Sequence, residues 1–174
     1  MVKPLFQNVL IVINASEASI HAAQYGILMS KLYHCNLKAV YVVDTASLKQ
    51  LTTNKFFVAE ESNMFEKNLL ADGQRYLDYV SDLAKAKGVK IETEIRSGAV
   101  WSEVIMAADE MKAGLILLGG YKSEMNSSVI EKHDAVSSFS RDIISHANCS
   151  VLVVREKMIE QLYKLAWGKL WELL

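Results

Sequence analysis

The residue types in this chain that could do chemistry gather in three short polar segments. Asn14–Ser16 follows a continuous apolar run, Gly119–Gly120 follows another, and Ser137–Ser138 precedes an amphipathic stretch. Small residues let backbone N–H groups approach a ligand, and the first turn of a helix favours an anion such as phosphate. The segments therefore predict a phosphate-binding crevice if the fold brings them together. The competing interpretation is that the glycines only end a strand and the serines only cap a helix.

The elements that position these segments follow from the spacing of the apolar residues. Continuous apolar runs predict strands buried on both faces of a parallel sheet, and strict alternation predicts a half-exposed edge strand. The continuous runs are residues 8–13, 37–43, 115–118 and 151–154, and the alternating run is 89–95, ended by Ser97-Gly98. Apolar residues at intervals of three and four predict the helices between them. Those stretches are residues 20–32, 65–84, 100–111 and 138–145.

This alternation of strands and helices predicts an α/β fold with a doubly wound five-stranded parallel sheet. Helices must cover both faces, because parallel strands need right-handed crossovers. Residues 45–61 are polar and less regular, and residues 120–134 have the composition of a mobile loop. Ligands bind such sheets outside the carboxyl ends of the strands, where the strand order reverses. That edge would bring the three polar segments together.

Composition bounds the function classes. The chain has 174 residues, of which 51% are hydrophobic and 22% charged, as in an ordinary soluble domain. Nineteen basic against twenty acidic residues argue against a nucleic-acid binder, which usually carries a basic excess. Two distant cysteines predict a reducing compartment, and we expect a cytoplasmic protein with no signal peptide. No apolar window reaches the 18 residues of a membrane span.

Three segments resemble the universal stress protein family: Val9–Ser19, Ala113–Gly120 and Ser137–Val154, whose end runs His-Ala-x-Cys-x-Val-Leu-Val-Val. The order and spacing match over about residues 7–155. The resemblance implies a sheet of order 3-2-1-4-5, a dimer and roles in stress survival and regulation. In one branch of the family it also implies ATP in the crevice. We expect a domain over residues 1–155 and a separate extension over 156–174.

The chain departs from the pattern of the ATP-binding branch. Gly119 matches the first glycine of that pattern, but Lys122 stands where the second is expected and the following loop is about five residues longer. Lysine cannot replace a glycine freely where the backbone needs a positive φ or a close phosphate approach. Asn14 replaces an aspartate that contacts the nucleotide in the family. Asparagine keeps an acceptor and adds donors, so contact with a nucleoside stays open.

The candidate ligand-binding residues are Asn14, Ala15, Ser16, Val42, Gly119, Gly120, Lys122, Ser137 and Ser138. Ala15 stands for a glycine of the family, Ser137 stands for another, and Ser138 keeps the hydroxyl. The side chains of Lys122, His133 and Arg141 could supply phosphate charge in another way, although such residues usually serve solubility. ATP therefore stays open as a cofactor, and an empty crevice is the leading alternative.

No catalytic or metal site is predicted. His34-Cys35 and His146-x-x-Cys149 have zinc-ligand types, but in the order 3-2-1-4-5 their strands lie three steps, roughly 14 Å, apart, which is too far for one ion. The nucleophile elbow, the phosphate loop Gly-x4-Gly-Lys-Ser/Thr and Cys-x-x-Cys are absent from the sequence. Glu92 and Glu94 share one face of a strand, where a solvated pair is expected.

Two surfaces predict association. The last strand would be a sheet edge, so we expect a homodimer through Val151, Leu152, Val153 and Val154, since pairing covers an apolar edge. Residues 156–174 have a helical pattern with two faces. That tail could pack on its own subunit or the partner subunit, dock on another protein, or lie on a membrane, although its polar face lacks the basic excess of membrane-surface helices.

Two functional hypotheses lead. One is a dimeric regulatory or interaction module with a degenerate crevice. The other is an ATP-binding stress protein in which the segment from Gly119 to Ser138 still holds phosphate. A small-molecule hydrolase or transferase is a weaker alternative, because the sequence contains no catalytic cluster.

Overall fold

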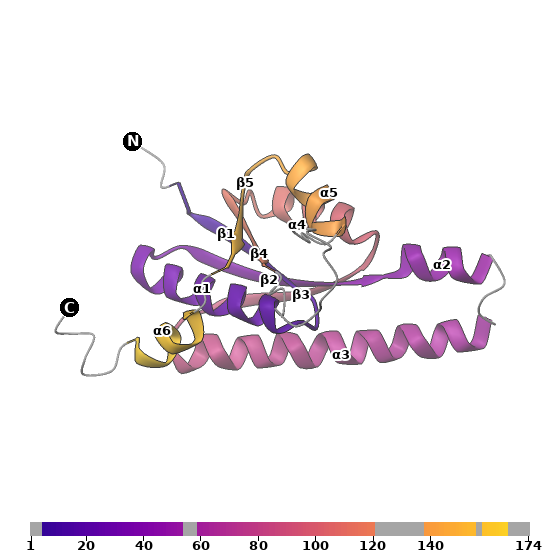
Figure 1. The fold of residues 1–174 in the computed structure, drawn as a ribbon, viewed down its shortest axis with the longest axis horizontal. Helices are drawn as coiled ribbons and strands as arrows, with labels where there is room; N and C mark the ends of the chain where they lie inside the picture. Colours follow the sequence, from indigo (N-terminus) through magenta and orange to yellow (C-terminus); the bar gives the residue numbers. More distant parts are fainter. Residues whose placement is uncertain (1–4, 54–58, 121–137, 156–157, 167–174) are drawn as a thin grey trace, which may run out of the picture.

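The computed structural model describes residues 5–53, 59–120, 138–155 and 158–166. Within them, five parallel strands form one sheet of order β3-β2-β1-β4-β5, which confirms the predicted architecture (Figure 1). The strands are β1 (Asn8–Ile13), β2 (Asn36–Asp44), β3 (Ile91–Gly98), β4 (Leu115–Gly119) and β5 (Ser150–Val154). The helices are α1 (Glu17–Tyr33), α2 (Thr45–Thr53), α3 (Ala59–Ala86), α4 (Val100–Glu110), α5 (Ser138–His146) and α6 (Ile159–Leu165).

Alternation along the strands divides the core into two layers. Side chains on one face of the sheet, such as Ile11, Ala39 and Leu117, pack under α1 and α3. Those on the other face, such as Leu10 and Ile116, pack under α4 and α5. The central strands β1 and β4 are apolar at every buried position because both of their faces are covered. None of the helices in the described ranges is long and apolar enough to cross a membrane.

The interpretation of residues 45–61 as an irregular stretch is wrong. Residues 45–53 form α2, and α3 already begins at Ala59. The carboxylate of Asp44 starts α2, since it accepts hydrogen bonds from the backbone N–H of Ser47 at 3.0 Å and from its hydroxyl at 2.6 Å. With α2, the first half of α3 extends well past the sheet (Figure 1).

Two element ends also bear on the predictions. The prediction that Ser97 and Gly98 end the strand after residue 95 is wrong, because both residues belong to β3 and pair with Val43 and Asp44 of β2. Gly88 lies just after the end of α3, with a left-handed φ of 66° that favours glycine. The loop predicted at 120–134 lies outside the described residues from position 121 onward.

The C-terminal extension packs on its own chain where it is described. Ile159, Tyr163 and Ala166 are buried, and α6 lies against α1. The Tyr163 hydroxyl donates to the Leu83 carbonyl of α3 at 2.6 Å, and the Lys87 ammonium donates to the Ala166 carbonyl at 2.9 Å. That residues 156–174 form an extension separate from the domain over residues 1–155 stays a prediction. Residues 167–174 lie outside the described part of the chain.

One buried polar group in α1 predicts a stabilising substitution. Gln24 is 5% exposed, and among the buried side-chain polar atoms of the described residues its Oε1 is the one without a hydrogen-bond partner. A buried carbonyl without a donor costs about 1–3 kcal/mol. Gln24→Met should therefore raise the free energy of unfolding by about 1 kcal/mol in urea titrations. Gln74→Met is the matched control, because Gln74 is exposed; an equal gain there would contradict this explanation.

Candidate functional site

The carboxyl ends of β1 and β4 lie side by side at the point where the strand order reverses. Ile11 of β1 is opposite Leu117 of β4, so the loop after β1 and the end of β4 share one edge. The helices that follow these strands cover opposite faces of the sheet, α1 on one and α5 on the other. The fold thus places Asn14–Ser16 beside Gly119, at the position where open α/β sheets bind ligands.

The loop after β1 is held by its own hydrogen bonds. Ser16 caps α1, because its Oγ accepts from the Ser19 N–H at 3.2 Å. The same hydroxyl donates to Asn14 Oδ1 at 2.5 Å. The Ser19 hydroxyl contacts the carbonyl oxygens of Ser16 at 2.8 Å and Asn14 at 3.4 Å. The candidate side chains Asn14 and Ser16 are therefore brought together and fixed in one geometry.

Tyr76 of α3 is a further residue of this site. Its hydroxyl donates to the Ala15 carbonyl at 3.3 Å, across 61 positions of sequence. Tyr76 belongs to the apolar pattern of its helix, so the sequence indicated a core role and offered no signal for this contact. Close packing brings α3 to this position: a Cβ on Gly73 would lie 2.5 Å from the ring of Tyr41 in β2.

The glycines of the site are required by packing. A Cβ on Gly119 would lie 2.4 Å from the carbonyl carbon and oxygen of Ala18 in α1, closer than real Cβ contacts. A Cβ on Gly120 would lie 2.8 Å from the Val154 carbonyl, which accepts the Gly120 N–H at 2.9 Å. These contacts support the interpretation that both glycines are needed for close packing at the end of β4, Gly119 against α1 and Gly120 against β5. That role does not depend on a ligand.

Of the remaining candidate residues, some belong to described strands and helices and others lie outside the described part of the chain. Val42 of β2 is partly buried in the core layer under α4 and α5. Ser138 is the first residue of α5, and Arg141 is exposed on the same helix. Lys122, His133 and Ser137 lie outside the described residues, so their part in the site stays a prediction.

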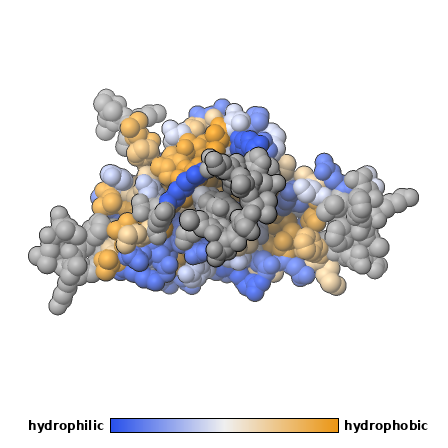
Figure 2. All heavy atoms as spheres, in the orientation of Figure 1, coloured by the Kyte–Doolittle hydropathy of each residue, from blue (hydrophilic) through white to orange (hydrophobic). Residues whose placement is uncertain are grey.

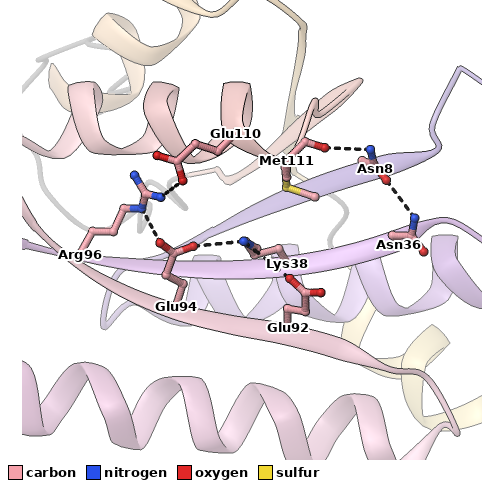
Figure 3. A network of polar contacts seen from close by, with 8 residues as sticks. All are labelled: Asn8, Asn36, Lys38, Glu92, Glu94, Arg96, Glu110 and Met111. Atoms are coloured by element: carbon pink, nitrogen blue, oxygen red, sulfur yellow. Dashed lines mark hydrogen bonds and ion pairs between the residues drawn. The ribbon is translucent and has the colours of Figure 1, made fainter.

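Charged side chains of β2, β3 and α4 form a network of ion pairs, whereas the sequence predicted only a solvated pair, Glu92 and Glu94 (Figure 3). Glu92 is 79% exposed, as expected, but Glu94 bridges Lys38 at 3.2 Å and Arg96 at 2.8 Å. Arg96 also pairs with Glu110 of α4. That hydrogen bond raises the pKa of Arg96 and lowers the pKa of Glu110. A carboxylate that is paired with a cation is a poor general base. The charged side chains on β3, an edge strand of the sheet, also protect that edge from pairing with another strand.

The cysteines of the two zinc-ligand pairs are free thiols, with Cys35 buried and Cys149 partly buried. Burial raises the pKa of the Cys35 and Cys149 thiols, which disfavours the reactive thiolate. The His146 ring lies 4.8 Å from that of Trp101, and its Nδ1 is 2.8 Å from the Asp142 carbonyl. Among the described residues, no group of three or more His, Cys, Asp and Glu side chains could hold a metal ion.

Comparison with known proteins tests the resemblance directly. The model of the universal stress protein family matches residues 5–155, most of the chain. The chain belongs to this family. A universal stress protein of Methanocaldococcus jannaschii is 30% identical to this member over 158 residues, which are 87% of this chain and 84% of the relative.

Solved structures of universal stress proteins share the fold. The structure of a family member from Burkholderia pseudomallei has a TM-score of 0.67 at 20% identity and covers 89% of this chain and 100% of its own. A universal stress protein from Arabidopsis thaliana, solved with AMP bound, has a TM-score of 0.58 at 14% identity. It covers 85% of this chain and 90% of its own.

Proposed function

We propose that this universal stress protein is a dimeric regulatory protein whose crevice between β1 and β4 binds a nucleotide but has departed from the pattern of the ATP-binding branch. The observation that carries the proposal is the fixed loop at Asn14–Ser16, which stands beside Gly119 at the switch point of the sheet. A relative from Arabidopsis thaliana was solved with AMP, which supports a nucleotide as the ligand class. The unpaired, distant cysteines support action in the cytoplasm.

A regulatory role fits the chemistry of the described residues better than catalysis does. The carboxylates of Glu94 and Glu110 are neutralised by Arg96, and burial raises the pKa of both thiols. A nucleophile needs an adjacent base or a lowered pKa to act. These carboxylates and thiols are therefore poorly suited to catalysis, and we favour a role in which binding of a ligand changes the surface that the protein presents to partners.

Calorimetric titration with Mg-ATP tests the altered crevice. We expect weak binding, with a Kd of about 1 mM, because Lys122 and Ser137 stand where the ATP-binding branch has glycines that let the backbone approach the phosphates. Binding at micromolar strength, lost in Asn14→Ala, would contradict this expectation. It would favour the second candidate, an ATP-binding stress protein in which the segment from Gly119 to Ser138 holds the phosphates.

The geometry of β5 supports the dimer. Within the described residues β5 pairs only with β4, and its side chains at 151–153 are partly exposed. Figure 2 shows hydrophobic surface over β5. The Val154 carbonyl accepts from Gly120 beside β4, so the alternate peptide groups of Val151 and Val153 face the free edge. We propose that a second copy pairs there, since a twofold axis covers both edges at once.

Val153→Pro should convert the dimer into a monomer. Proline removes an N–H that faces the free edge, and an edge strand tolerates this change because the ladder to β4 does not use that group. We expect the dissociation constant to rise at least about tenfold, which is 1.4 kcal/mol, in sedimentation equilibrium. Ile144→Ala, at an exposed apolar side chain of α5, is the control and should leave the dimer intact. An unchanged Val153→Pro dimer would place the interface elsewhere.

A further inference from the structure

We infer that one exposed side of α6, formed by Met158, Leu162 and Leu165 and called here the α6 flank, packs against a second copy of this chain. The flank thereby extends the dimer interface that begins at β5. The inference rests on the proposed dimer and names the surface that joins β5 in it. The family model matches residues 5–155, so α6 is an addition to the family domain.

The apolar surface of α6 is wider than its contact with its own chain. Ile159, Tyr163 and Ala166 are buried on one side of the helix. At about 100° per residue, the α6 flank adjoins that side, and the two together cover about 160° of the circumference. The side chains of the flank are 39% to 57% exposed. Because Tyr163 and Lys87 anchor the helix to α3 through hydrogen bonds, the flank is held at the surface.

The strand β5 is too small to make a stable dimer by itself. It has five residues, of which Val154 is buried and those at 151–153 are only partly exposed. A stable interface takes about 20–30 residues and about 800 Å² from each partner. Further surface must therefore join β5 in the dimer. The first exposed large apolar side chains after β5 are those of the α6 flank.

The position of α6 makes its flank continuous with the edge that is proposed to pair. A short connection leads from Val154 of β5 to Ile159 of α6, and both elements pack against α1. Figure 1 shows α6 below β5, at the end of the layer that α1 and α3 form. A second copy that pairs with β5 thus meets α6 as the neighbouring surface.

The charges of α6 are compatible with self-association. On its polar side, the Lys164 ammonium donates to Glu160 Oε1 at 2.6 Å. A twofold axis places the same surface of both copies in the interface, so a charge that is not balanced there would face its own copy. The pair is balanced within the helix and adds no like-charge repulsion. A second copy of this chain is therefore the occupant that we assign to the α6 flank.

Sedimentation equilibrium of the whole chain tests the inference. Leu165→Gln replaces an apolar side chain by a polar one of similar size, and we expect the dissociation constant of the dimer to rise at least about tenfold. Met64→Gln is the matched control. Met64 is 67% exposed on the part of α3 that extends past the sheet, so this change should leave the dissociation constant as it is.

The same substitution in a monomer separates a contact with the partner from a contact within the chain. In the Val153→Pro background, Leu165→Gln should leave the melting temperature unchanged, because Leu165 is exposed in the single subunit. A fall in the melting temperature of that monomer would show that residues 167–174 of the same chain cover the α6 flank. That result would overturn the inference.

The remaining outcomes keep the two proposals apart. If Val153→Pro breaks the dimer and Leu165→Gln leaves its dissociation constant unchanged, the β5 interface stands and the role of α6 is wrong. If the parent chain is a monomer at every concentration, both proposals fail. A dimer weakened by Leu165→Gln but not by Met64→Gln, with the monomer equally stable, supports the α6 flank as part of the interface.

Discussion

Replacing Gly119 by alanine will lower the free energy of unfolding by about 3 kcal/mol. For a chain of this length, that loss lowers the melting temperature by about 6–12 °C. The added methyl would lie 2.4 Å from the backbone of Ala18 and 2.6 Å from the nitrogen of Ser19. A flexible side chain could turn away, but backbone in the first turn of α1 cannot move without opening the contact between α1 and β4. Thermal unfolding followed by circular dichroism measures the change.

Gly88→Asn is the matched control for this prediction. Gly88 has a φ of 66°, but a Cβ there would make only an ordinary contact, 3.6 Å from the Lys31 Nζ, and asparagine tolerates the left-handed conformation better than most residues do. We expect a loss of about 1 kcal/mol or less. An unchanged melting temperature for Gly119→Ala would contradict the tight contact between β4 and α1, and with it the geometry of the crevice.

Tyr163→Ala will cost about 3–5 kcal/mol, because it removes the main contact between α6 and the rest of the chain. The ring is 7% exposed, its hydroxyl donates to the Leu83 carbonyl, and the Lys87 ammonium lies 4.7 Å from its centroid. The variant leaves a cavity, an unpaired carbonyl and a cation without its aromatic partner. Guanidinium titration of the purified protein measures the loss.

Leu162→Ala tests whether the loss belongs to the buried side of α6. Leu162 is 39% exposed on the same helix, so its removal should change stability by less than about 1 kcal/mol. Equal effects of the two variants would mean that α6 does not pack through Tyr163. A Tyr163→Ala protein as stable as the parent would show that the extension contributes nothing to the fold.

The strands could be predicted from sequence because a strand buried on both faces is apolar at nearly every position. The runs at 8–13 and 115–118 match β1 and β4 to within a residue. The helix α2 could not be predicted in the same way. It buries few side chains, among them Leu48, and it starts on the carboxylate of Asp44, so it has a cap but almost no apolar stripe.

The parts of the candidate site that could be predicted follow from the order of the strands, which places Asn14–Ser16 beside Gly119, and from local residue types. The Asn14–Ser16 segment and the Ser16 cap follow from local residue types. The Tyr76 contact and the role of Glu94 do not, because each depends on which elements the fold brings together. Gly119 illustrates the same limit, since its residue type fits both a phosphate contact and the packing contact that the structure shows.

The most direct test of the nucleotide crevice is to locate the ligand in the protein. Two-dimensional ¹H–¹⁵N spectra would be recorded during a titration with Mg-ATP, up to concentrations that saturate binding. The proposal predicts that the largest shifts fall on the backbone amides of Ala15–Ser19 and Gly119–Gly120, at the carboxyl ends of β1 and β4. Shifts confined to another surface, such as the charged network around Arg96, or no shifts at all, would contradict it.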